Sequence, residues 1–284
     1  MLGIYGRALA GVTVVPAARK VGLFRSEGLP ERRLELDNVE VDRHHLAEYD
    51  RVCGFRLRDE LPPTYPHIVA FPLAMELMTA PTFPFPAIGL VHIENRIEVV
   101  RPMSAGEPFS VKVWAADLAD HERGKQFVVH AEASVAGSGV VWRDASTYLS
   151  HAGGSGGEKS DKERSSARSS SEPPAASAVW EVPADVGRRY AAVSGDRNPI
   201  HLYSWTAKTF GMKTNIAHGM WTKARCLAAL EGELPDAYTV EVRFKLPIFL
   251  PAKVAFSTDT REFAVHDAKS GKPHLEGAIR TVAS

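Results

Sequence analysis

The hydrophobic and polar positions of this chain write one pattern twice. An alternating stretch at residues 36–41 precedes a stretch of helical period at residues 42–52, and the same order returns at residues 179–182 and 185–193. Alternation places every second side chain on one face of a strand, whereas a spacing of three and four residues gives a helix one apolar face. The pattern therefore predicts a strand followed by a helix in each half of the chain.

Each half continues with an apolar helical run and then with further strands. The runs begin at Tyr65-Pro66-His67-Ile68 and at Ile216-Ala217-His218-Gly219, and each is expected to form the central helix of its half. Strand-like segments separated by turn signals follow at residues 89–99, 109–114, 126–136, 140–149, 238–246, 253–260 and 274–282. A strand, a helix and an antiparallel meander, repeated once, predict an α+β protein.

A polar segment divides the two repeats. Gly153-Gly154-Ser155-Gly156-Gly157 is followed by charged and Ser-rich residues and by Pro173-Pro174. Such a composition has little to bury and is typical of a flexible connection. We therefore expect a first half over residues 1–150, a flexible linker over 151–177 and a second half over 178–284.

A short segment of the second half carries the candidate chemistry. Pro199 fixes its own backbone and disfavours helical geometry at Asn198, and Gly195 gives backbone freedom just before Asp196. The segment therefore reads as a shaped loop that presents the Asp196 carboxylate, the Asn198 amide and the His201 imidazole. A carboxylate and an imidazole together suit proton transfer on a small substrate. The alternative is purely structural, with side chains that close turns or pack as in any loop.

The region from Tyr190 to about Leu230 resembles the signature of the MaoC-like dehydratases, the R-specific enoyl-thioester hydratases. The matching elements are Tyr-Ala-Ala-Val-Ser-Gly-Asp-Arg-Asn-Pro-Ile-His at 190–201, Ala207, Phe210-Gly211 and Ile-Ala-His-Gly-Met at 216–220. The resemblance implies a double hotdog, with two antiparallel sheets each wrapped around a long central helix. It also implies addition of water to a trans-2-enoyl thioester, or its removal from an (R)-3-hydroxyacyl thioester, without a metal or cofactor.

Five residues are candidates for the site. Asp196 and His201 would be the acid–base pair, with a contribution of roughly 10²–10⁴-fold for each proton transfer. Gly219, at the start of the central helix, would offer its free N–H to the thioester oxygen. Asn198 would hold the loop and orient water, and His218 would contact either substrate or backbone. For Gly219 taken alone, close packing of two elements is the simpler explanation.

The first half departs from this pattern. Phe55 stands where the second half has Asp196, and the connector from Gly54 to His67 is too short for a catalytic loop. We therefore expect the first half to be catalytically silent, with His67 and His92 as structural histidines, and to accommodate the acyl chain. The stiff insert Pro81-Thr82-Phe83-Pro84-Phe85-Pro86 is a candidate wall of that space.

Composition narrows the partners. Lys and Arg (34) balance Asp and Glu (34), which predicts neither nucleic-acid binding nor attraction to anionic membranes. The opening residues lack a convincing signal peptide, and no stretch is apolar enough to cross a bilayer. The two cysteines, Cys53 and Cys226, are expected to pack as small apolar side chains in a protein of a reducing compartment. We expect a cytoplasmic enzyme acting on acyl-CoA or acyl carrier protein thioesters. A hotdog thioesterase and a non-catalytic acyl-binding subunit are the alternatives, and a homodimer is left open.

Overall fold

The computed structural model describes residues 28–151, 175–259 and 261–281. Nearly all of the predicted linker, and the opening segment examined for a signal peptide, lie outside the described residues. Within them, no helix is both long and apolar enough to cross a membrane.

The first half forms a strand, two helices and a four-stranded meander. Its elements are β1 (Arg33–Val39), α3 (Arg43–Cys53), α4 (Tyr65–Met78), β2 (Val91–Val99), β3 (Phe109–His121), β4 (Gly124–Val135) and β5 (Gly139–His151). Asp42 caps α3 by accepting the N–H groups of His44 and His45, and Gly54 ends the helix with a φ of 86°. The helix from 42 to 52 predicted by the apolar spacing is therefore confirmed almost to the residue.

The second half repeats this order with an insertion before its central helix. Its elements are β6 (Ala178–Val182), α6 (Val186–Ser194), α7 (Pro199–Leu202), α8 (Ser204–Lys208), α9 (Gly219–Ala229), β7 (Tyr238–Phe244), β8 (Ala252–Thr258), β9 (Glu262–Asp267) and β10 (Pro273–Thr281). The insertion consists of the candidate loop with α7 and α8, and the first half has no counterpart among its described residues. The short connector between Gly54 and His67 had predicted this difference.

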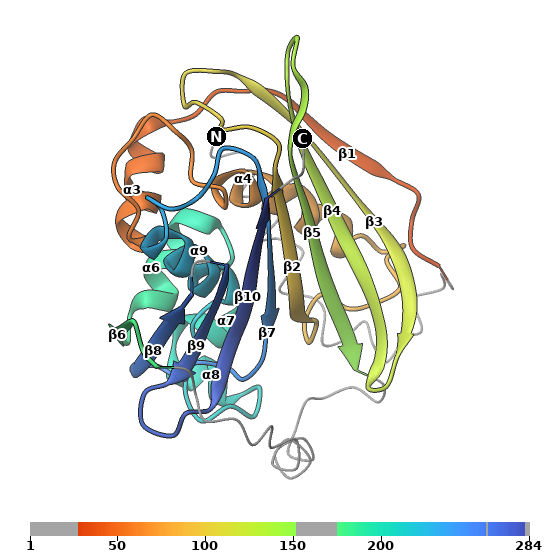
Figure 1. Ribbon diagram of the computed structural model, residues 1–284. Helices are drawn as coiled ribbons and strands as arrows, with labels where there is room; N and C mark the ends of the chain where they lie inside the picture. Colours follow the sequence, from red (N-terminus) through yellow and green to blue (C-terminus); the bar gives the residue numbers. More distant parts are fainter. Residues whose placement is uncertain (1–27, 152–174, 260, 282–284) are drawn as a thin grey trace.

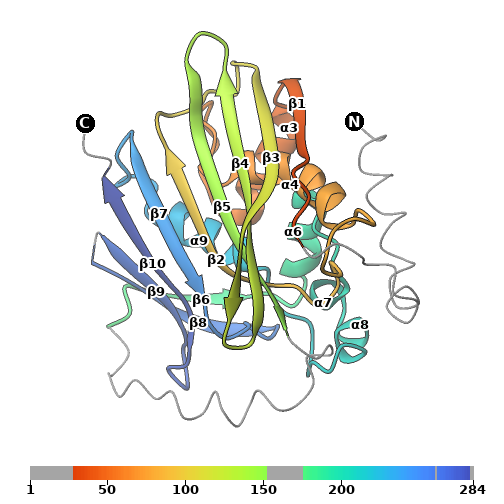
Figure 2. The same cartoon turned by 90° about the vertical axis from the view of Figure 1, so that its right-hand side faces the viewer.

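The strands of the two halves form one continuous sheet. Its order is β1-β3-β4-β5-β2-β7-β10-β9-β8-β6, and the two half-sheets join where β2 and β7 pair antiparallel from Glu94↔Arg243 to Val99↔Tyr238. This pairing joins the two half-sheets of the predicted double hotdog, because a free edge on each half would leave backbone groups unpaired. The sheet curves around the helices, with first-half strands on one side and second-half strands on the other (Figures 1 and 2).

Contacts between the helices complete the interface between the halves. His45 bonds through Nε2 to the carbonyl oxygen of Val193 at 2.8 Å, and the rings of Tyr49 and Tyr190 lie 6.3 Å apart. These two tyrosines occupy matching positions of α3 and α6, so the halves meet as a pseudo-symmetric pair. Cys53 and Cys226 are both buried and form no disulfide, as their scarcity had suggested.

Candidate active site

The loop that carries Asp196 is shaped by its own short hydrogen bonds. Helix α6 ends at Gly195, whose φ of 76° turns the chain away from the helix axis. The Asp196 N–H donates to Ser194 Oγ at 3.2 Å, and the Asn198 N–H donates to Asp196 Oδ1 at 3.1 Å. Asn198 then caps α7 by accepting the Ile200 N–H at 3.4 Å. These hydrogen bonds hold the Asp196 carboxylate in place on the turn between α6 and α7.

His201 has one ring nitrogen tied to the backbone. Its Nδ1 lies 2.9 Å from the carbonyl oxygen of Ile216, and a carbonyl can only accept, so Nδ1 carries the proton. In the neutral ring Nε2 then holds a lone pair. Burial lowers the pKa of His201 below its ordinary 6.5, against the opposing charge of Asp196. The His201 ring is therefore neutral at physiological pH.

His218 is bonded to the same loop, but through its other ring nitrogen, Nε2. Its Nε2 donates to the backbone carbonyl of Asp196 at 3.0 Å, which leaves its buried Nδ1 without a hydrogen-bond partner among the described residues. Burial first, and then the neighbouring charge of His201, lower the pKa of His218 to about 3. The ring stacks on that of His201 with centroids 3.7 Å apart. Of the two roles foreseen for His218, this contact favours support of the loop through its backbone.

Asp196 combines access with an ionised carboxylate. Its side chain is 29% exposed, and Oδ2 lies 3.7 Å from His218 Nε2. Burial raises the pKa of Asp196, but the charges of His218 and His201 and the Asn198 N–H outweigh it, and the pKa lies below its usual value. A charged carboxylate and a neutral imidazole thus lie together at the start of α7, as the sequence predicted.

Gly219 begins α9 and lies under an aromatic ring. A Cβ at this position would be 2.9 Å from Cε1 of Phe244, closer than such atoms approach in proteins. The first N–H groups of a helix have no partner within the helix, and they carry its positive dipole end. Close packing against Phe244 therefore favours glycine at this helix start.

A metal ion is one further possibility for this cluster. One ligand atom from each of Asp196, His201 and His218 lies within 4.8 Å of the others. Both imidazoles, however, donate one ring N–H to a backbone carbonyl, and the remaining nitrogen of His218 is buried. The arrangement suits proton transfer by Asp196 and His201, and metal-free chemistry remains our expectation.

Sequence reasoning missed a row of buried polar side chains beside this site. Asp144 on β5 accepts hydrogen bonds from His67 Nδ1 at 2.9 Å and from Asn95 Nδ2 at 3.0 Å. Asn95 Oδ1 in turn accepts a hydrogen bond from Nζ of Lys223, a fully buried lysine on α9. The available signal was polar residues at inward positions of β2 and β5, where alternation calls for apolar ones.

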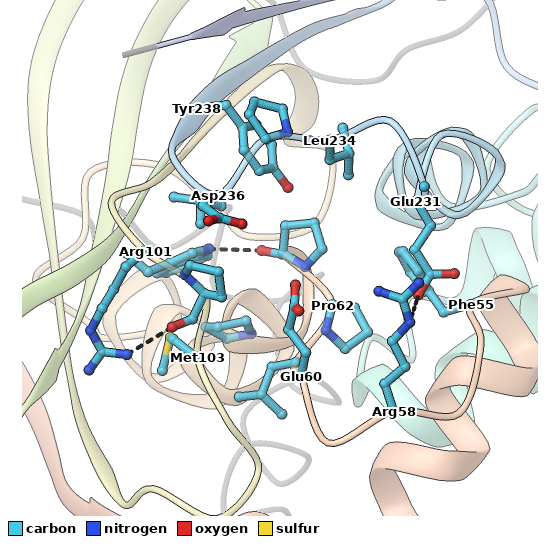
Figure 3. Close-up of a pocket in the computed structure, with 18 residues that line it drawn as sticks. Phe55, Arg58, Glu60, Pro62, Arg101, Met103, Glu231, Leu234, Asp236 and Tyr238 are labelled. Atoms are coloured by element: carbon cyan, nitrogen blue, oxygen red, sulfur yellow. Dashed lines mark hydrogen bonds and ion pairs between the residues drawn. The ribbon is translucent and has the colours of Figure 1, made fainter. Parts of the chain in front are cut away.

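A separate cavity of about 280 Å³ lies at the N-terminal end of α4 (Figure 3). Phe55 lines it, and the Arg58–Glu231 ion pair, 3.3 Å between Nε and Oε1, closes one side. Because Phe55 aligns with Asp196, this is where the repeat would place a second catalytic loop. Neither Asp196 nor His201 lines the cavity, and an apolar ring replaces the carboxylate there.

Comparison with known proteins gives this geometry a context. The family model described as MaoC like domain matches residues 163–276. The 3-hydroxyacyl-thioester dehydratase X of Mycobacterium tuberculosis is 37% identical over 280 residues, which cover 96% of this chain and 95% of that protein.

Solved structures agree with the architecture. The crystal structure of HtdX from Mycobacterium tuberculosis superposes with a TM-score of 0.76 at 34% identity, covering 88% of this chain and all of that one. Another Mycobacterium tuberculosis protein, described as having a double hotdog fold, gives a TM-score of 0.51 at 10% identity over 88% of this chain and 96% of that one. The second likeness concerns the fold alone, and it confirms the predicted double hotdog.

Proposed function

This chain belongs to the MaoC-like dehydratases, and from that premise we propose that it interconverts (R)-3-hydroxyacyl thioesters with trans-2-enoyl thioesters and water. The observation that carries the proposal is the pairing of an ionised, accessible Asp196 carboxylate with a His201 ring whose Nε2 lone pair is free. Both groups accept protons, and the two lie side by side on one turn of the loop.

One proton suffices for the reaction. In dehydration, the Asp196–His201 pair removes the proton from C2 and returns it to the oxygen on C3, while the C3–O bond breaks and water leaves. Hydration runs the same transfers in reverse, from water to C2. A base of moderate strength is enough because the C2 proton is acidified by the adjacent thioester carbonyl, whose oxygen gains charge during the step.

The helix start at Gly219 supports stabilisation of that charge. Its N–H, together with the dipole of α9, would lie against the thioester oxygen as the enolate forms. Asn198 contributes by capping α7, which fixes the distance between Asp196 and His201 along the loop. His218 contributes by holding the Asp196 backbone carbonyl in place.

A row of aromatic rings runs through the first half from Tyr148 on β5. Burial, and after it the charge of Asp196, raises the pKa of Tyr148. Its ring stacks on Phe127 at 5.7 Å, and Phe127 stacks on Phe85 of the predicted insert at 5.4 Å. We propose that the acyl chain extends along this aromatic row, so that the half without a catalytic loop accommodates the tail.

The substrate is proposed to arrive as a thioester of CoA or of acyl carrier protein, with no further cofactor. Two buried cysteines without a disulfide support a reducing, cytoplasmic location. The halves already pair within one chain, so the proposed site needs no second copy. Light scattering would show whether two copies of the chain form a homodimer.

The direct test is incubation with crotonyl-CoA. Hydration removes the enoyl absorbance without releasing thiol, and this is the expected result. Release of free CoA would indicate a thioesterase, and no reaction would indicate an acyl-binding subunit. Either of these outcomes would contradict the proposal.

A further inference from the structure

The first half places an imidazole–carboxylate pair inside the molecule. His67, in the first turn of α4, lies with Nδ1 2.9 Å from Oδ2 of Asp144 on β5. The side chain of Asp144 is 2% exposed and that of His67 12% exposed. A carboxylate can only accept, so Nδ1 of His67 carries a proton and the ring orientation is fixed.

The carboxylate of this pair is held in its charged form by its surroundings. Burial raises the pKa of Asp144, but the charge and hydrogen bond of His67, the Asn95 amide and the Lys223 charge outweigh it, so the pKa lies below its usual value. Ser146 Oγ donates a further hydrogen bond at 2.8 Å. Such a network is costly to bury unless each member is satisfied, and it rigidifies whatever it holds. Here it holds His67.

The second ring nitrogen of His67 is left for another partner. Among the described residues nothing hydrogen-bonds to Nε2 of His67. The side-chain nitrogens that are fully buried and lack a partner include His92 Nε2 and His218 Nδ1, but they do not include His67 Nε2. Nε2 therefore reaches accessible space. A bonded Nδ1 with an accessible Nε2 is also the arrangement of His201.

Ring contacts connect His67 to the Asp196 site. Its ring is nearly parallel to that of His92, with centroids 6.5 Å apart, and His92 lies 5.0 Å from the ring of Phe244. Phe244 in turn covers Gly219 at the start of α9. The charge of His67 also acts on Asp196: burial raises the pKa of that carboxyl, and His67 is one of the groups that lower it. His67 is therefore linked through the rings of His92 and Phe244 to the helix start at Gly219.

We propose that His67 is a further catalytic residue of this site, supplied by the half that lacks the catalytic loop, and that its Nε2 hydrogen-bonds the oxygen on C3 of the acyl thioester. This inference rests on the proposed hydratase function. The oxygen is the hydroxyl in dehydration and the attacking water in hydration.

The role follows from the timing of proton transfer. Until the Asp196–His201 pair has taken the C2 proton, both of its groups are acceptors, whereas an oxygen that begins to leave C3 gains negative charge and is stabilised by a donor already in place. When the His67 ring binds a second proton, Nε2–H becomes that donor, and the positive charge lies against Asp144. No proton is transferred permanently, because the C2 proton still ends on the departing water.

Replacement of His67 tests the proposal with crotonyl-CoA as substrate. His67→Gln keeps an N–H for Asp144 but loses the outward nitrogen, and His67→Ala leaves a space that dissolved imidazole can enter. We expect kcat to fall at least about 10-fold in both variants, with KM changed by less than about 3-fold, because the lost contact forms mainly in the transition state. Added imidazole should restore part of the activity of His67→Ala.

The matched control is His130→Gln. His130 pairs with Asp117 at 2.9 Å in the same half, but it stacks on Trp114 on the solvent-facing side of β3. This control should keep kcat within 2-fold. If wild type hydrates crotonyl-CoA while His67→Gln keeps kcat within 2-fold, the inference is overturned and the proposed function stands. If His67→Ala does not fold, His67→Gln decides alone, whereas an inactive wild type would overturn the proposed function itself.

Discussion

The imidazole rings of His201 and His218 stack with centroids only 3.7 Å apart, yet they carry their protons on different nitrogens. His201 donates from Nδ1 to Ile216, whereas His218 donates from Nε2 to the backbone of Asp196. Each carbonyl fixes one tautomer. His201 therefore keeps a lone pair on Nε2, whereas His218 holds the loop through the backbone carbonyl of Asp196.

Asp196→Asn and His201→Ala should each reduce hydration of crotonyl-CoA by at least about 10²-fold. Since the two side chains handle one proton, the double variant should be little worse than the more damaged single variant. Steady-state kinetics measures this, with thermal melting as the check that each variant folds. Additive losses would show that the two residues act in separate steps.

The pH profile should reflect the buried state of His201. Burial lowers its pKa below 6.5, so Nε2 keeps its lone pair on moderate acidification. We expect kcat/KM to stay constant as pH falls through 6.5 and to decline only at lower pH. An acidic limb centred at or above pH 6.5 would contradict this.

The same acidification should weaken the fold through His218. Its pKa is about 3 in the folded protein against an ordinary value of 6.5, so the unfolded chain binds the proton first. This contribution to stability is present above pH 6.5 and is lost as pH falls from 6.5 towards 3. Urea unfolding at several pH values measures it, and His218→Asn should flatten the dependence in that window.

Gly219→Ala should lower kcat by at least about 10-fold, because the new Cβ would be 2.9 Å from Phe244 and would push the ring or the helix start out of place. Gly232→Ala is the matched control, since a Cβ there meets nothing within 4 Å. Adding Phe244→Leu to Gly219→Ala should recover part of the activity by relieving the contact. An unchanged Gly219→Ala enzyme would remove this helix start from the site.

Phe85→Ala should separate short substrates from long ones. If the acyl chain extends along Tyr148, Phe127 and Phe85, loss of the last ring should raise KM for a dodecenoyl thioester and leave crotonyl-CoA unaffected, since each buried CH₂ contributes about 0.8 kcal/mol. Trp114→Leu, on the solvent-facing side of β3, is the control. Equal losses on both substrates would indicate general damage, and no change would mean that the chain goes elsewhere.

Local patterns predicted most of the fold because they encode it directly. The spacing of Leu46, Tyr49 and Val52 predicted α3, and Gly195 together with Pro199 predicted the loop between α6 and α7. Strand β9 was missed because Glu262–Asp267 is only six residues long and lies beside a turn. The join of β2 to β7 was missed because strand pairing between halves leaves no local signal.

The residues of the site were likewise predicted where they lie close together in the sequence and missed where they do not. Asp196, Asn198 and His201 lie within six residues and were visible as a motif, and Gly219 marked a helix start. The partnership of His67 with Asp144 joins residues 77 positions apart, and that of Lys223 with Asn95 joins residues 128 apart. Such pairs are created by the packing of the two halves, so a reading along the chain could not find them.

The measurement that tests the central claim most directly is the identity of the product formed from crotonyl-CoA by wild type and by Asp196→Asn. Wild type should yield (R)-3-hydroxybutyryl-CoA, resolved by chiral chromatography, with no free thiol, and Asp196→Asn should yield almost none. The (S) isomer, release of CoA, or equal product from Asp196→Asn would contradict the account.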